Sequence, residues 1–369
     1  MKIGIDISQM CYEGTGVARY TRELTGALLK EHPNHVFTLL AGAWRQKEFF
    51  TQIHSQQPWS TAKLRLYGLP PKLAGLVLNT VPVPFEWIGG RYDVFHASDW
   101  VQPITSMKTV TTVHDLVFRK YPETVDLLIR KVQEFRLSRI AKGSVHVIVD
   151  SMSTKNDLKK IYAIDDERID VIYPGINSTW KPATKKEIER VKTKYTLPDQ
   201  YILSVGTQEP RKNIARLAAA AEKVGLPLVL VGHYGWGDSL TPGVKSAHTP
   251  GMLSLGHVPD ADLSALYTGA AVFAYPSLYE GFGFPVLEAK ACGTPVVTSN
   301  VSSLPEVGGE SAVLVSPTDV DAIAAGIQHA MQEREKRIDR GFTEVKSFTW
   351  NSAAKATLEV YEKISKGYI

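Results

Sequence analysis

The chain has 369 residues, of which 44% are hydrophobic and 22% are charged, and its formal net charge is +4. This composition is typical of a soluble globular protein, no apolar run is long enough to span a bilayer, and the length predicts two domains. The mild positive charge suits an anionic ligand or an acidic membrane surface and does not by itself indicate nucleic acid.

The chain has two cysteines, Cys11 and Cys292, which lie far apart and lack the spacing of a metal site. They favour a reducing compartment and argue against a disulfide framework. The first six residues predict a strand rather than a secretion signal. We therefore expect a cytoplasmic protein.

The chain begins with a strand, a glycine-containing loop and a helix. An apolar run over residues 2–8 predicts the strand, and an amphipathic helix is expected from Val17 to Lys30. Between them lie Gly14, Thr15 and Gly16. This order resembles the phosphate-binding opening of a nucleotide fold, although the full G-x-G-x-x-G is missing. The loop is therefore either a phosphate-binding loop or a tight turn without a ligand.

Five further strand candidates follow in the first half of the chain. They are Val36–Ala41, Lys63–Tyr67, Asp93–Ala97, Thr109–His114 and Val145–Asp150. Their alternation with helical or loop stretches predicts a parallel sheet with crossover helices. Residues Gly68–Gly90 are rich in proline and aromatic side chains, so we interpret them as an irregular surface segment.

Two histidines occur where predicted strands end. They are His96 and His114, and Asp115 follows the second. Ligands bind beyond the carboxyl ends of the strands in open parallel sheets, so both histidines are candidate site residues. A lone histidine is more often structural, and the stronger hypothesis concerns His114.

Residues Asp126–Lys142 predict a helix with a basic face and an apolar side. Over residues 127–142, which leave out Asp126, five Lys and Arg residues against Glu134 give a local charge of 5 − 1 = +4. Two interpretations stand. The helix contacts an anionic membrane surface, or it buries its apolar side in the core and exposes its charges to water, which is the commoner arrangement.

A domain boundary is predicted near residue 175. A strand candidate over Ile169–Ile176 ends the first series, and a charged helix over Lys181–Lys194 follows. We expect an N-terminal domain of residues 1–175 and a C-terminal domain of residues 176–351. The second series of strand candidates comprises Tyr201–Gly206, Leu226–Gly232, Met252–Leu255, Ala271–Tyr275, Pro295–Ser299 and Ala312–Val315, and a helix over 352–369 ends the chain. Two such series predict two nucleotide-fold domains with a ligand-binding cleft between them.

Two loops of the second domain follow strands and carry charged residues. The first contains Thr207, Arg211 and Lys212. Arginine offers a planar fork and lysine a compact charge, so this pair could neutralise a diphosphate. The second loop contains Glu280 and leads into a helix that carries Glu288. Both loops should reach the same edge of their sheet.

The second loop has the features of an anion-binding or hydroxyl-binding turn. Pro285 suits a first helical position, because its missing N–H has no partner there in any helix. Gly281 and Gly283 allow close approach to the backbone, and the unpaired N–H groups of the helix carry positive charge. The alternative is that Glu280 and Glu288 are an ordinary loop acid and an ordinary helix acid.

Two Asp-x-Asp sequences have the form that holds divalent metal in some sugar transferases. Asp260-Ala261-Asp262 and Asp319-Val320-Asp321 both precede helical runs, where Asp is a common cap or first-turn residue. We therefore predict no metal site. The sequence has no His/Cys cluster for zinc, no Gly-x-Ser-x-Gly elbow and no full P-loop, which argues against a serine hydrolase and a P-loop kinase.

The stretch from Glu280 to Glu288 matches the signature of the retaining glycosyltransferases of family four, in which seven residues separate two glutamates. Residues 289–297 continue it as in those enzymes. Val171–Asn177 resembles the interdomain linker of the family, and Asp150–Leu158 resembles its serine-rich segment. The resemblance covers nearly the whole chain.

This resemblance implies the α/β GT-B architecture: two facing Rossmann-like domains with parallel sheets and an interdomain cleft. It implies that the C-terminal domain holds the nucleotide-sugar donor, that the N-terminal domain holds the acceptor, and that the last helix joins the first domain. It also implies site residues. Glu288 would bind the ribose, Lys212 the diphosphate, and Glu280 with the N–H groups of Gly281, Phe282, Gly283 and Phe284 the transferred sugar.

Further roles follow from the same resemblance. His114 would lie near the reactive carbon of the sugar, and Gly14, Thr15 and Gly16 would form the first glycine loop. Thr207 departs from the pattern, because many members of the family carry arginine there. Arg211 could compensate.

We therefore expect a retaining hexosyltransferase, with mannose from GDP-mannose as the preferred donor and a glycan or lipid-linked acceptor. It would use no metal or other cofactor, react at the front face of the sugar, and bind no nucleic acid. A peripheral contact at the inner face of an anionic membrane is the further expectation from the basic helix. The alternatives are a sugar-nucleotide epimerase of the same fold and a non-catalytic subunit that binds nucleotide sugars.

Overall fold

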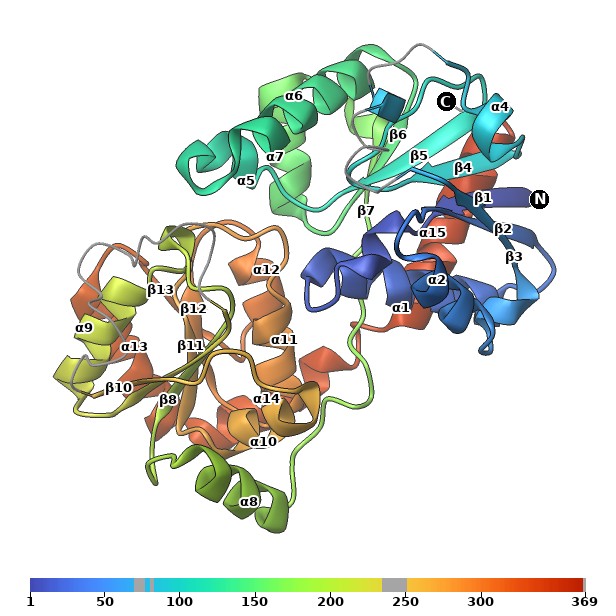
Figure 1. Cartoon of the computed structure of the whole chain (residues 1–369). Coiled ribbons are helices and arrows are strands. Elements are labelled where there is room, and N and C mark those ends of the chain that lie inside the picture. Colours follow the sequence, from blue (N-terminus) through green and yellow to red (C-terminus); the bar gives the residue numbers. More distant parts are fainter. Residues whose placement is uncertain (70–76, 80–82, 234–250, 368–369) are drawn as a thin grey trace. The chain divides into compact units, whose positions relative to one another are not determined.

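The computed structural model describes residues 1–69, 77–79, 83–233 and 251–367 (Figure 1). The chain forms two compact units. Unit 1 comprises Met1–Arg119, Asp126–Gly175 and Thr349–Ile369, and unit 2 comprises Lys120–Val125 and Ile176–Phe348. The end of the chain therefore belongs to the same unit as its beginning.

Unit 1 is built on a seven-stranded sheet in the order β3-β2-β1-β4-β5-β6-β7, and every neighbouring pair is parallel. The strands are β1 Lys2–Asp6, β2 Val36–Gly42, β3 Lys63–Tyr67, β4 Val94–Ala97, β5 Lys108–Val113, β6 His146–Val149 and β7 Ile169–Val171. The strand order reverses between β1 and β4. Ligands of open α/β sheets bind at such a switch point.

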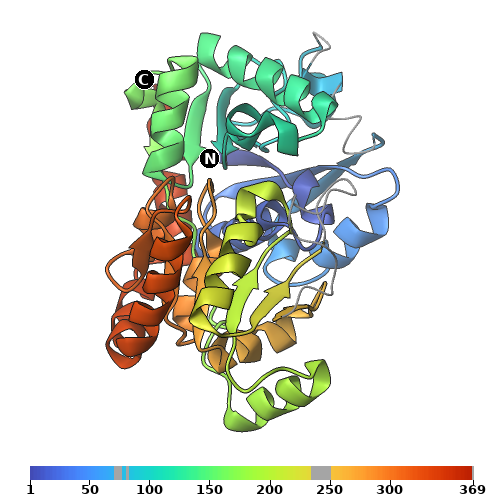
Figure 2. The same cartoon turned by 90° about the vertical axis from the view of Figure 1, so that its left-hand side faces the viewer.

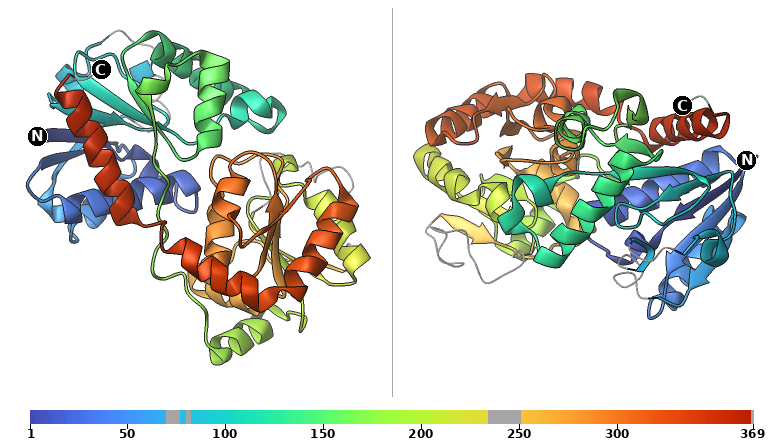
Figure 3. Two further views of the ribbon diagram at one scale, coloured as in Figure 1. Left: turned by 180° about the vertical axis from the view of Figure 1, so that it is seen from behind. Right: turned by 90° about the horizontal axis from the view of Figure 1, so that it is seen from above.

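Helices cover both faces of this sheet, as a fully parallel sheet requires. The helices of unit 1 are α1 Gly16–Glu31, α2 Lys47–His54, α4 Glu86–Gly89, α5 Val117–Lys120, α6 Leu127–Lys142, α7 Met152–Tyr162 and α15 Trp350–Ser365. Helices α1 and α15 pack against each other on one face, and α6 and α7 lie on the other (Figures 1 and 3). The central strands are consequently buried along their length.

Unit 2 is built on a six-stranded parallel sheet in the order β10-β9-β8-β11-β12-β13. The strands are β8 Ile202–Val205, β9 Leu228–Val231, β10 Met252–Ser254, β11 Val272–Tyr275, β12 Val296–Ser299 and β13 Val313–Val315. The helices are α8 Lys185–Tyr195, α9 Ile214–Val224, α10 Asp260–Gly269, α11 Phe284–Ala291, α12 Leu304–Gly308, α13 Val320–Gln332 and α14 Arg334–Val345.

The two faces of this second sheet carry separate apolar cores. One core joins the strands to α9 and α13 through Leu217, Ile323 and Ile327. Figures 1 and 2 show these two helices beside the sheet. The other joins them to α10 and α11 through Leu266 and Leu287. The sheet is held on both faces, so the loops at its carboxyl edge project from a rigid base.

The predicted strands all occur, with shifted ends. The first strand stops at Asp6 rather than residue 8, because the backbone turns into a short 3-10 helix, Ser8–Cys11. The carboxylate of Asp6 fixes that turn by accepting from the N–H and the hydroxyl of Ser8 at 2.9 and 2.6 Å. The strand that begins at Ile169 stops at Val171 rather than Ile176.

The segment Gly68–Gly90 lies partly outside the described residues, which omit 70–76 and 80–82. The described part contains the short helix α4 and Phe85, which is buried against Phe95. Across the described ranges, no helix is both long enough and apolar enough to cross a membrane.

The last helix is held to unit 1 by a close backbone approach at Gly175. A Cβ atom at this position would lie 2.1 Å from the backbone nitrogen of Trp350 and 2.5 Å from the carbonyl carbon of Thr349. Real Cβ atoms do not approach backbone so closely, so only glycine fits without movement of the chain.

We predict that Gly175→Ala destabilises the protein by about 2–3 kcal/mol, because either the linker or the start of α15 must move. Urea denaturation followed by circular dichroism measures this change. Gly68→Ala is the matched control: no atom of the described residues lies within 4 Å of its added Cβ, and its effect should stay within about 0.5 kcal/mol. Equal stability of the two variants would contradict the prediction.

Candidate active site

Two loops meet at the carboxyl edge of the sheet in unit 2. Strands β8 and β11 are neighbours, and parallel strands end at the same edge. A single 3-10 turn, Pro210–Lys212, follows β8, and the loop that contains Glu280 follows β11. The N–H of Leu278 donates to the carbonyl of Arg211 at 2.8 Å, so the backbones of the two loops are joined.

Glu280 lies between two cations. Its Oε1 is 2.7 Å from the Nζ of Lys212, and its Oε2 is 2.7 Å from the Nη1 of Arg211. Nη1 of Arg211 also donates to the carbonyl of Tyr279 at 2.7 Å, and its Nη2 pairs with Glu209. Three residues that the sequence analysis selected from separate loops thus form one cluster.

This cluster is largely shielded from water: the side chains of Lys212 and Glu280 are 12% and 9% exposed. Burial by itself raises the pKa of Glu280, but the adjacent charges of Arg211 and Lys212 outweigh it and hold the pKa at about 2. Burial, together with the charge of Arg211, lowers the pKa of Lys212. Glu280 is therefore a carboxylate at neutral pH.

Two serines that the sequence analysis did not select fix the backbone of Glu280. The hydroxyl of Ser302 donates to the carbonyl of Glu280 at 2.5 Å and accepts from its N–H at 3.0 Å. The hydroxyl of Ser303 donates to the carbonyls of Glu280 and Phe282 at 3.0 and 2.8 Å. Their position directly after the strand β12 was the available signal, because that strand ends at the same edge.

The loop after Glu280 enters helix α11 through Gly283. Its φ of +113° is in the region that favours glycine, and Pro285 lies in the first turn as predicted. The helix begins at Phe284, one residue before the predicted start at Pro285. The side chain of Phe282 is 4% exposed and packs on Phe284, so it is a core residue whose backbone forms the loop. Gly281 is buried in the same loop.

Glu288 lies within α11, where its side chain is buried. Its Oε2 accepts a hydrogen bond of 2.8 Å from the hydroxyl of Tyr267, in helix α10. The structure thus gives Glu288 a partner in the core of unit 2. Its assignment to the ribose stays a prediction.

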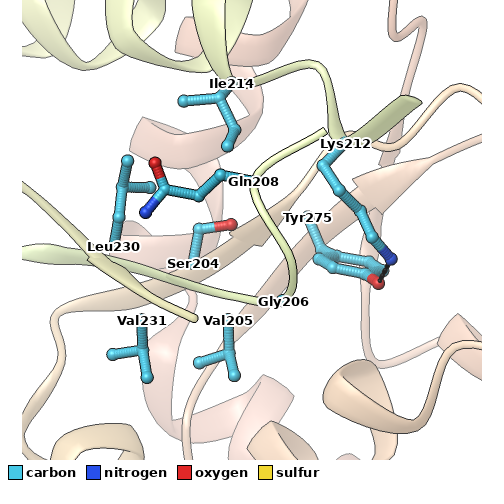
Figure 4. A pocket seen from close by; sticks show the side chains of 9 residues that line it. All are labelled: Ser204, Val205, Gly206, Gln208, Lys212, Ile214, Leu230, Val231 and Tyr275. Carbon is cyan, nitrogen blue, oxygen red and sulfur yellow. Dashed lines mark hydrogen bonds between the residues drawn. The ribbon is translucent and has the colours of Figure 1, made fainter. Parts of the chain in front are cut away.

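A small pocket adjoins Lys212 at the end of β8 (Figure 4). Its lining includes Gly206, Gln208 and Tyr275, and the hydroxyl of Tyr275 accepts a hydrogen bond from Lys212. Gly206 approaches Gly232 so closely that a Cβ on Gly232 would lie 2.1 Å from the Gly206 carbonyl oxygen. Only glycine therefore fits at position 232 without movement of the backbone. Thr207, in the same loop, is exposed.

The candidate residues of unit 1 form a separate group at the carboxyl ends of β5 and β6. Nδ1 of His114 is 2.6 Å from Oδ2 of Asp150, and the side chain of Asp150 is 3% exposed. The ring of Tyr20 meets that of His114 edge-on at 4.6 Å. Burial alone would lower the pKa of His114, but Asp150 raises it to about 9. His114 is consequently an imidazolium at neutral pH.

The two other candidates of unit 1 have structural partners. His96 is buried and bonds to Tyr361 and Thr112 at 2.5 and 2.9 Å, and burial lowers its pKa to about 3. It therefore holds helix α15 to the sheet. Thr15 caps α1 by accepting from the N–H of Ala18. Its neighbours Gly14 and Gly16 are exposed, and Gly14 has a φ of +83°.

An aspartate of each Asp-x-Asp sequence has a structural partner within unit 2. The carboxylate of Asp319 accepts from two N–H groups at the start of α13. Asp262 pairs with Arg190 and Lys194 at 2.6 Å each. Within the described ranges, no group of three or more His, Cys, Asp or Glu side chains is placed to hold a metal ion.

Two Rossmann-like units of parallel sheet, the second with a lysine, an arginine and a glutamate at its carboxyl edge, define a glycosyltransferase of the GT-B class. Residues 14–180 match the family model "Glycosyltransferase Family 4", and residues 185–341 match "Glycosyl transferases group 1". The chain belongs to the glycosyltransferases of family four, as the Glu280–Glu288 signature indicated, and it is an enzyme.

The chain is 32% identical to the O-antigen chain mannosyltransferase B of Escherichia coli, over 98% of this chain and 100% of that protein. Its fold is similar to that of sucrose-phosphate synthase from Thermosynechococcus elongatus, with a TM-score of 0.73, 21% identity and 99% of both chains covered. It is also similar to HepE of Anabaena in complex with UDP, with a TM-score of 0.69, 17% identity and coverage of 98% of this chain and 99% of that one.

We predict that Asp150→Asn lowers the pKa of His114 from about 9. Because the folded pKa is raised above the ordinary value of about 6.5, the ion pair stabilises the protein below that pH, and this stabilisation is lost as the pH rises through about 9. The variant should therefore show a flatter dependence of Tm on pH in this window. NMR titration of labelled imidazole measures the pKa directly.

Asp115→Asn is the matched control for this titration. Asp115 also raises the pKa of His114, but its charge contributes least among the named causes, and its carboxylate bonds to the N–H of Val117. Its replacement should shift the midpoint less than that of Asp150. A larger shift for Asp115→Asn would show that the ion pair is not the main cause.

Proposed function

We propose that the enzyme transfers a hexose, with mannose from GDP-mannose as the preferred donor, to a glycan or lipid-linked acceptor with retention of anomeric configuration and without metal. The observation that carries the proposal is the buried cluster in which Glu280 lies between Arg211 and Lys212. The choice of mannose is supported by the O-antigen chain mannosyltransferase B of Escherichia coli, to which the chain is 32% identical.

The cluster suits a leaving nucleoside diphosphate. Departure of the donor's diphosphate develops negative charge, and cations that are already in place stabilise that charge without reorganisation. Glu280 holds Arg211 and Lys212 at the strand ends, where a phosphate oxygen would bind the same cations while they stay paired with the carboxylate. The N–H groups at the start of α11 add positive charge at the same edge.

The state of Glu280 favours binding of the sugar over a covalent role. A carboxylate with a pKa of about 2, whose two oxygens both pair with cations, is a weak nucleophile and cannot donate a proton at neutral pH. It would accept hydrogen bonds from sugar hydroxyls. A double displacement through paired carboxylates, as in retaining hydrolases, is therefore disfavoured.

Front-face attack is the corresponding mechanism. The acceptor hydroxyl would approach from the side of the leaving phosphate, and a phosphate oxygen would take its proton. His114, held as an imidazolium by Asp150, would donate a hydrogen bond from Nε2 to the sugar or a phosphate. A covalent sugar adduct on Glu280 during turnover would overturn this mechanism.

A transfer assay with purified enzyme tests the function. GDP-mannose should give a mannosylated acceptor with retained configuration, determined by NMR, at a rate that EDTA leaves within about twofold. Glu280→Gln should lower kcat by about 100-fold or more, as for loss of a fixed polar group at the reacting centre. Glu310→Gln, a change of an acid with an 80% exposed side chain, is the matched control.

Other results of this assay would count against particular parts of the proposal. Loss of activity in EDTA that Mg²⁺ or Mn²⁺ restores would contradict metal independence. Turnover of UDP-glucose in place of GDP-mannose would contradict the donor. Inversion at C2 of the donor without any acceptor would identify an epimerase, and donor binding without transfer would identify a binding subunit.

Lys212→Ala should weaken GDP binding by about 1.5–3 kcal/mol, the range for loss of one charged hydrogen-bonded contact. Isothermal titration calorimetry measures the Kd. Lys223→Ala is the control, because this lysine of the same unit pairs with Asp321 at the surface and should leave the Kd unchanged. An unaltered Kd for Lys212→Ala would remove this lysine from the diphosphate site.

A further inference from the structure

Helix α6 presents apolar side chains to the outside as well as to the core. Leu127, Leu128 and Phe135 are 58%, 62% and 46% exposed. Leu137 and Ile140 are buried on the opposite side, together with Gln133 and Arg136. An ordinary amphipathic helix has one apolar side, which faces the core, so the exposed apolar side chains of α6 are additional to that arrangement. Exposed apolar side chains that gather on one element mark an interaction site more often than isolated ones do.

The rotation of α6 is fixed by Arg136, which is completely buried. Its Nη2 donates to the hydroxyl of Thr111 at 2.6 Å, and its Nη1 donates to the side chains of Gln133 and Asp99 at 3.0 and 3.2 Å. Gln133 donates in turn to the carbonyl of Asp99 at 2.9 Å. A helix held by these bonds must direct Phe135 outward.

Basic residues share the outer face with the apolar ones. Lys131 lies four residues before Phe135 and Lys142 seven residues after it, which places all three on one side of a helix, and both lysines are exposed. The guanidinium of Arg139 lies 5.8 Å from the ring centre of Phe135. The one acid within the helix, Glu134, is turned toward Tyr162, whose hydroxyl donates to it at 3.0 Å.

We infer that the face formed by Leu127, Leu128, Lys131, Phe135 and Lys142 docks on an anionic lipid surface. The leucines and the phenylalanine would enter the headgroup region, and the lysines would pair with lipid phosphates, as in helices that lie in the plane of a membrane interface. A protein partner is disfavoured, because lysine is depleted in protein–protein interfaces. The inference rests on the proposed function in one respect: a lipid-linked acceptor would be met at that surface.

Vesicle co-sedimentation tests this face separately from activity. The enzyme should sediment with vesicles of phosphatidylglycerol and phosphatidylcholine in equal parts, and at least tenfold less with phosphatidylcholine alone. The double variants Lys131→Glu/Lys142→Glu and Leu128→Ser/Phe135→Ser should each lower the bound fraction at least fivefold. Lys185→Glu/Lys186→Glu, which reverses two exposed charges at the start of α8, is the matched control and should bind as the unaltered enzyme does.

The outcomes separate this inference from the proposed function. Turnover of a short water-soluble acceptor should be unchanged in all of these variants. Vesicle binding does not require transfer, so it can be measured even if the proposed transferase activity is not found. Equal binding to neutral and anionic vesicles, or full binding by either double variant of α6, would overturn the inference. An enzyme that binds no vesicles would overturn it as well.

Discussion

The ion pairs of Glu280 are the interaction on which the site depends. Taking a carboxylate, a lysine and an arginine out of water is costly, and their mutual attraction offsets this cost only when the geometry is good. Here each carboxylate oxygen has its own cation, and two serines fix the backbone beneath it. Removal of one partner would leave a buried charge unpaired, so the loss of any one of these residues would destabilise the whole cluster.

The need to hold Glu280 beside both cations explains how unit 2 is built. The cations follow β8 and the acid follows β11, two strands that are adjacent in space although their loops are nearly 70 residues apart, and the serines follow β12. Apolar cores on both faces hold these strands in register. The sheet therefore sets the positions of the loops, and the loops set the positions of the charged side chains. A destabilised sheet would weaken the site without any change to a site residue.

Much of this organisation follows from the sequence. The alternation of strands and helices predicted both parallel sheets, and the rule that parallel strands end at one edge brought Arg211, Lys212 and Glu280 together. The same pattern did not predict that Glu280 would bond to both cations, because loop conformation depends on contacts such as those of Ser302. It favoured His114 over His96 only through the adjacent Asp115, since burial and the partners Tyr361 and Asp150 appear only in three dimensions.

Helix α6 shows why periodicity alone is insufficient where a buried charge intervenes. Its sequence has apolar side chains on two sides, and the side that is buried carries Leu137 and Ile140 together with Arg136. In the interior Arg136 bonds to Asp99, Gln133 and Thr111. Leaving a buried guanidinium without its hydrogen bonds would cost more free energy than the burial of two leucines at the end of a helix would gain. The exposed leucines are thus a consequence of the orientation that buries Arg136 together with Leu137 and Ile140.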